Sequence, residues 1–78
     1  MTAEVLPKIQ KAFVSVFGRQ VPFTASLDRV AEPRWTSLKH VEFLIALENE
    51  FGVRFDGADA TEMTSIAAIA ARVAPRGA

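Results

Sequence analysis

The chain contains no cysteine and only one histidine, His40. Without cysteine it has no disulfide, no thiolate zinc site and no cysteine nucleophile of its own. A single histidine does not make a metal site, so we expect no bound metal. No apolar run reaches about 18 residues, the length that a membrane-spanning helix needs. We therefore expect no metal and no membrane segment.

The start, MTAEVLPKIQ, lacks the basic and then apolar order of a signal peptide, so we expect a cytoplasmic protein. The chain has 78 residues, of which 50% are hydrophobic, enough for one small core. We expect a single domain over residues 1–78.

So short a chain leaves little room for a substrate pocket, and no acid and base stand at a plausible spacing with a supporting group. A binding, carrier or interaction module is favoured over an enzyme.

Charge is segregated along the chain although its formal net charge is zero. Residues 1–39 carry a net charge of +3, and residues 40–62 carry −5. Nucleic-acid binding needs a concentrated basic face, so an acidic centre argues against a nucleic-acid partner and against a small DNA-binding domain. A basic protein partner fits the acidic centre better.

Apolar residues at helical spacing predict an amphipathic helix over residues 3–17 that starts close to Pro7 and stops at Gly18. The periodicity then fails from residue 19 to residue 36, which predicts a long connection. A loop of this length is unusual unless it is pinned or functional. The residues that we expect to pin it are Phe23, Leu27, Val30 and Trp35.

A second helix is predicted over residues 37–51, a short third one near Asp56 and Asp59, and a last one that follows Thr64 or Ser65 and ends before Pro75. The second helix has a broad apolar arc, which predicts contact with several neighbours as in a bundle. The arc consists of Phe43, Leu47, Phe51, Leu44, Val41, Ile45 and Leu38. For His40 we expect a partly buried or flanking position and no catalytic role.

Ser37 stands at the first turn of this second helix, directly after Thr36. Either hydroxyl could cap the helix, because serine and threonine side chains accept a backbone N–H there. The free N–H groups of a helix start also favour an attached phosphate, so a serine there is well placed to carry a phosphodiester. The residues alone leave both roles open.

The run TSLKHVEFLIALENEFGVRF, with TEMTSIAAIAARV after it, resembles the acyl carrier proteins and related phosphopantetheine-attachment domains. Their hallmark is Asp-Ser-Leu at the start of the second helix, followed by an amphipathic run that ends in a segment like ALEEEF. The length, the long first loop and the short third helix also agree. The resemblance covers nearly the whole chain.

The resemblance implies an all-α, right-handed four-helix bundle of the acyl carrier type, without catalytic activity of its own and monomeric. It implies that Ser37 receives 4′-phosphopantetheine from coenzyme A through a magnesium-dependent phosphopantetheinyl transferase. The thiol of this arm then carries acyl groups as thioesters to and from acyl-loading and acyl-using enzymes. The helix face that carriers show to such enzymes corresponds here to Leu38, Lys39, Val41, Glu42 and Ile45.

Several residues depart from the family pattern. Thr36 replaces the aspartate of the motif, Lys39 is basic where fatty-acid carriers have an acid, and Asn49 replaces one acid of the EEE run. The neutral net charge is also unlike that of the strongly acidic carriers. We therefore expect a specialised carrier for a dedicated lipid, polyketide or related pathway, outside housekeeping fatty acid biosynthesis. The alternative is an unmodified carrier-like bundle that acts through protein–protein contact, with Ser37 as a plain cap.

Overall fold

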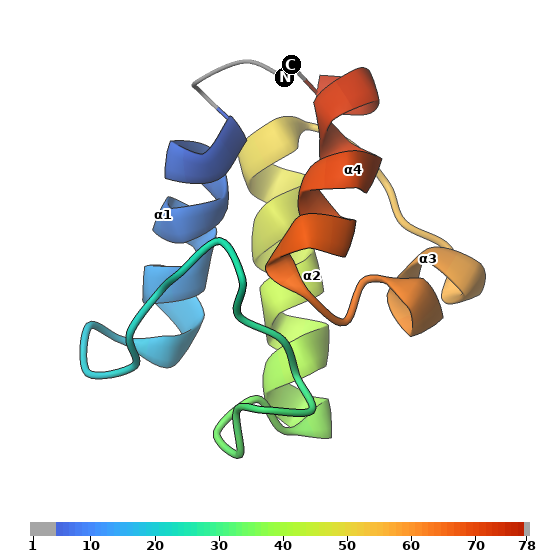
Figure 1. Cartoon of the computed structure of the whole chain (residues 1–78). Helices are drawn as coiled ribbons and strands as arrows, with labels where there is room; N and C mark the ends of the chain where they lie inside the picture. The colour runs from blue at the N-terminus through green and yellow to red at the C-terminus, as the bar shows by residue number, and fades with distance from the viewer. Residues whose placement is uncertain (1–4, 78) are drawn as a thin grey trace.

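The computed structural model of the chain describes residues 5–77, with side chains for residues 5–74. Four α-helices follow one another (Figure 1): α1 at Val5–Phe17, α2 at Ser37–Phe51, α3 at Gly57–Glu62 and α4 at Ile66–Gly77. Apart from one isolated bridge, the described residues form no β-structure. The predicted all-α class, long first connection and short third helix are confirmed.

The three longer helices, α1, α2 and α4, pack against one another. α1 lies beside α2 and runs in the opposite direction, and α4 packs against both of them (Figure 1). The short α3 lies to one side, directly before the start of α4. This arrangement is a small helical bundle.

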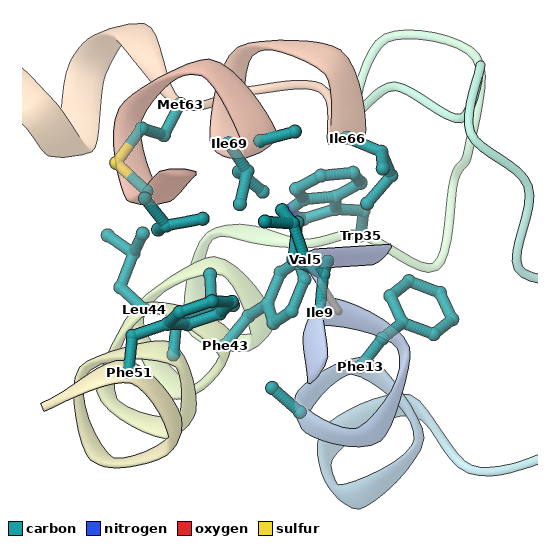
Figure 2. Packing of buried hydrophobic residues seen from close by; sticks show 14 of the residues in the cluster. Val5, Ile9, Phe13, Trp35, Phe43, Leu44, Phe51, Met63, Ile66 and Ile69 are labelled. Atoms are coloured by element: carbon teal, nitrogen blue, oxygen red, sulfur yellow. The ribbon is translucent and has the colours of Figure 1, made fainter. Parts of the chain in front are cut away.

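One apolar core joins the helices. Buried residues recur at spacings of three and four in α1, α2 and α4, which places them on one face of each helix. Figure 2 shows these side chains meeting, with Trp35 of the long loop among them. The buried apolar residues are Val5, Ile9, Ala12, Phe13, Val21, Trp35, Phe43, Leu44, Leu47, Phe51, Met63, Ile66, Ile69, Ala70 and Val73.

Aromatic rings hold the long loop against the helices. The Phe43 ring of α2 lies 5.6 Å from Phe13 and 5.5 Å from Trp35 between ring centroids, both in edge-to-face geometry. Phe23 of the loop reaches the same cluster, 5.3 Å from Phe13. Edge-to-face pairs are favourable because the positive ring edge meets the negative ring face. The predicted role of Trp35 as a packing anchor is confirmed.

Backbone hydrogen bonds fix the middle of the loop to the start of α4. The Arg29 N–H donates to the Thr64 carbonyl at 2.8 Å, and the Ile66 N–H donates to the Leu27 carbonyl at 2.9 Å. Leu27 is half-buried against the core, as predicted. These bonds hold the long connection against the bundle, as we expect for a loop of this length in a small domain.

Two expectations about these segments are wrong. Val30 does not pin the loop, because its side chain is 96% exposed. It lies in a turn in which the Asp28 carboxylate accepts the Ala31 N–H, so the turn directs Val30 to solvent. α4 does not end before Pro75 but continues to Gly77. Proline so close to a helix end removes only one late backbone hydrogen bond.

Candidate functional site at the start of α2

Thr36 and Ser37 perform different tasks at the start of α2. Thr36 is the N-cap, with an extended backbone and a side-chain Oγ1 that accepts the Lys39 N–H at 3.2 Å. Ser37 is the first helical residue, and its side chain is exposed. Capping therefore does not use the Ser37 hydroxyl. The interpretation of Ser37 as a plain cap is wrong.

Arg29 of the long loop reaches across to Ser37. Its Nη2 donates to Ser37 Oγ at 2.8 Å, and its Nε donates to the Trp35 carbonyl at 3.2 Å. The Arg29 backbone is itself fixed by its bond to Thr64 at the start of α4. Arg29, a half-buried residue, thus holds its guanidinium beside an exposed serine hydroxyl.

The turn before α2 is fixed by the pair formed by Glu32 and Arg34. The Arg34 side chain donates to both carboxylate oxygens of Glu32, at 2.9 and 3.1 Å, and its backbone N–H donates to Glu32 as well, at 2.8 Å. The side-chain hydrogen bonds first, and then the backbone bond, hold the pKa of the Glu32 carboxyl below its ordinary value. Glu32 is therefore ionised at neutral pH and keeps this turn in one geometry.

His40 links α2 to the loop and to α3. It is only 6% exposed, and its Nδ1 lies 3.0 Å from Trp35 Nε1. Because an indole N–H can only donate, Nδ1 accepts, and the proton on Nε2 is donated to the Ala60 carbonyl at 2.8 Å. Both ring nitrogens are used within the fold. His40 therefore holds the start of α2 in place, and it is more deeply buried than the partly buried or flanking position expected from the sequence.

An exposed apolar ridge follows Ser37 along α2. The ridge consists of Leu38, Val41 and Ile45, whose side chains are 67%, 54% and 53% exposed. The broad apolar arc of α2 is thus only partly covered by its neighbours, because the buried side of the helix is the one that carries Phe43 and Leu47. Exposed apolar side chains that lie together on one helix face are a feature of protein-binding surfaces.

Lys39 and Glu42 lie beside the ridge but differ in accessibility. Glu42 is exposed, whereas Lys39 is half-buried. Lys39 Nζ donates to the Val16 carbonyl in the last turn of α1 at 3.1 Å, and it lies 3.5 Å from a Glu42 carboxylate oxygen. Part of the Lys39 charge thus stabilises the end of α1. Of the predicted partner-binding residues, Leu38, Val41, Glu42 and Ile45 are open to a partner, and Lys39 is partly engaged.

Arg29 is the site residue that sequence reasoning missed. It stands eight positions before Ser37 in a segment without periodicity, so no sequence pattern connects the two residues. An exposed hydroxyl that is free of capping and has a cation beside it fits a phosphodiester attachment. In the described part of the chain, no three His, Asp or Glu residues are grouped as metal ligands.

Comparisons with protein-family models, with curated proteins and with solved structures find no match to this chain. None of the described helices is long and apolar enough to cross a membrane. Function is therefore inferred from Ser37 and the residues around it.

Proposed function

We propose that the protein is an acyl carrier in which Ser37 holds a 4′-phosphopantetheine arm, attached from coenzyme A by a phosphopantetheinyl transferase. The observation that carries this proposal is the position of Ser37. Its hydroxyl is exposed at the first residue of α2, capping does not use it, and the apolar ridge begins at the next residue. A partner that docks on the ridge is adjacent to the hydroxyl.

The surroundings of Ser37 suit the anion that the modification creates. The backbone N–H groups of the first helical turn point toward this end of α2, and the helix dipole favours negative charge there. Arg29 adds a full positive charge at hydrogen-bond distance. The bound arm supplies a thiol that holds acyl groups as thioesters, and the chain, which has no cysteine, has no other thiol.

The apolar ridge and Glu42 form the surface proposed for acyl-loading and acyl-using enzymes. An apolar centre with an acid at its rim fits an enzyme patch that is apolar and partly basic. Lys39 and Thr36 stand where the carriers of fatty acid biosynthesis have acids, which supports a dedicated lipid, polyketide or related pathway. Enzymes of general synthesis are then poor partners.

A thiol assay tests this proposal. After incubation with coenzyme A and a broad-specificity transferase, and removal of free coenzyme A, the wild type should react with one equivalent of a maleimide reagent. Ser37→Ala should react with none, and Ser26→Ala, which changes an exposed serine of the long loop, should behave as the wild type. The thiol should then accept an acyl group from a loading enzyme. A wild-type chain that never gains a thiol would rule out the carrier function.

Two observations favour a second function. The ridge is exposed without any arm, and Thr36 stands in place of the family's aspartate, as in a bundle that acts only by protein contact. This function requires that partner binding depend on Ile45 and be unchanged in Ser37→Ala.

A further inference from the structure

The position of Arg29 deepens the proposed function, on which this inference rests. We infer that Arg29 is the positioning residue for Ser37: it holds the hydroxyl before modification and pairs with the phosphodiester afterwards. Two contacts carry the inference, the 2.8 Å bond from Nη2 to Ser37 Oγ and the 3.2 Å bond from Nε to the Trp35 carbonyl. Together they fix the guanidinium through two of its nitrogens.

Before modification, the contact prepares the hydroxyl for transfer. Arg29 donates to a lone pair of Oγ, so the hydroxyl proton is left for a base of the transferase. In the transfer, a bond forms between Oγ and phosphorus, the bond between that phosphorus and the diphosphate bridging oxygen of coenzyme A breaks, and adenosine 3′,5′-bisphosphate leaves. A cation beside Oγ stabilises the negative charge that grows there as the proton departs.

After modification, the same guanidinium faces a monoanion. The phosphodiester has unesterified oxygens that accept hydrogen bonds, and a charge-assisted bond to arginine is stronger than one to a neutral hydroxyl. Arg29 is free to make this bond, because its described side-chain contacts are neutral ones to Ser37 and Trp35. The nearby Arg34 is already paired with Glu32 and is a weaker candidate. Among the described residues Arg29 has no anionic partner, and the phosphodiester of the arm supplies one.

Unfolding temperatures of the apo and modified forms test the pairing. In the wild type, attachment should raise the unfolding temperature, and in Arg29→Gln the rise should be smaller by roughly 4 °C, since one charge-assisted bond is lost. Arg29→Lys keeps a cation and should fall between the two. Arg19→Gln removes an exposed cation of the same loop and should match the wild type. The rise is the difference between the apo and modified forms of the same variant. Any loosening of the loop by loss of the Trp35 contact affects both forms and cancels from this difference.

Initial rates of modification test the positioning role. With carrier concentrations below KM, Arg29→Gln should be modified roughly tenfold more slowly than the wild type. If the wild type takes up no arm, the carrier function fails and this inference fails with it. If the wild type is modified but Arg29→Gln shows the same rate and the same rise in unfolding temperature, the carrier function stands and the role of Arg29 is refuted.

Discussion

At the residue scale, two neighbouring hydroxyl groups at the start of α2 have separate roles. Thr36 caps the helix through its Oγ1, and Ser37 presents its Oγ to solvent and to Arg29. The helix start does not require the aspartate that acyl carrier proteins have at this position, because threonine and aspartate both accept the backbone N–H there. In the proposed carrier, threonine in place of aspartate at position 36 therefore changes the surface offered to a transferase and leaves the helix start intact.

Replacing Thr36 with aspartate should speed modification of Ser37 and change stability little. The aspartate restores the acid that carriers present to the transferase, and it caps α2 as well as threonine does. Initial rates of arm transfer and urea unfolding, measured on both proteins, check this expectation. As a matched control, Thr36→Ala should destabilise the fold by about 1 kcal/mol through loss of the cap. Equal transfer rates for wild type and Thr36→Asp would show that the missing acid has no effect.

The pair formed by Glu32 and Arg34 should make stability depend on pH. The folded state lowers the pKa of Glu32, so the stabilisation is complete above the ordinary value of 4.5 and is lost as pH falls through the lower folded value. Arg34→Gln should therefore lower the unfolding temperature at pH 7, and the difference from wild type should shrink as pH falls below 4.5. Thermal unfolding from pH 7 to pH 3 checks this. A difference that stays constant over this range would contradict it.

The sequence reduces the number of possible roles for each residue at this site but does not decide between them. Thr36 and Ser37 are both good caps, and only backbone conformation decides which of them is the N-cap. Val30 and Trp35 are both apolar residues of one loop, yet a turn directs Val30 outward while Trp35 enters the core. The role of Arg29 could not be predicted, because its contact with Ser37 depends on how the long loop folds beside the start of α2.

At the element scale, α2 has two apolar sides, one buried and one exposed. One side carries Phe43 and Leu47 into the core, and the other carries the ridge of Leu38, Val41 and Ile45. Helical periodicity predicts the width of the apolar arc correctly. It does not say which part is covered, because that depends on where α1 and α4 lie. The broad arc is therefore core on one side and exposed surface on the other.

Truncations on the two sides of α2 should have unequal effects on stability. Leu47→Ala removes a fully buried side chain and should cost about 2–5 kcal/mol. Ile45→Ala removes a side chain that is about half exposed, and it should cost roughly 1 kcal/mol or less. Urea unfolding of both variants measures the difference. If Ile45→Ala is as costly as Leu47→Ala, Ile45 is a core residue and the ridge is not an open surface.

Charge changes beside the ridge should alter the choice of partner enzyme. Lys39→Glu should improve use by enzymes of general fatty-acid synthesis, and Glu42→Lys should weaken docking to the cognate enzyme, because like charges repel across an interface. A rim charge is worth up to about 1 kcal/mol, or roughly fivefold in kcat/KM. Steady-state rates with each carrier variant check both effects.

Lys39 also contacts the end of α1, so a control is needed for this comparison. Lys39→Gln removes the charge without adding an acid, and it separates the effect of the Val16 contact from that of repulsion. We expect it to fall between wild type and Lys39→Glu. If the wild type already serves general elongation as well as an acidic carrier does, the idea of a dedicated pathway is wrong.

At the scale of the whole molecule, the acidic centre is less exposed than the count of charges indicates. Glu48 accepts the Phe55 N–H at 2.7 Å, and Asp59 is buried, caps α3 together with Asp56 and pairs with Arg72. The contacts of Glu48 and Asp59 within the fold make these two acids less accessible to a partner, whereas Asp56 is exposed. Local charge counts from the sequence cannot make this distinction, because it depends on contacts with α3 and α4. Glu42, beside the ridge, remains open to a basic partner.

The class of the fold, the order of the helices and the approximate bounds of α1, α2 and α3 could be predicted because apolar spacing, caps and loop signals all agree for this chain. The end of α4 could not, because tertiary packing on Ile69 and Val73 supports a helix that passes Pro75. The placement of the long loop depends on the Trp35 anchor and on its bonds to the start of α4. These are long-range contacts, which no local pattern encodes.

Intact mass of the purified chain, after incubation with coenzyme A and a broad-specificity transferase, tests the central claim most directly. The wild type should gain the mass of one phosphopantetheine, and peptide mapping should place it on Ser37. Ser37→Ala should gain nothing, although its cap at Thr36 and its core are unchanged. An adduct that survives in Ser37→Ala, an adduct on Thr36, or no adduct on the wild type would contradict the assignment of Ser37 as the attachment site.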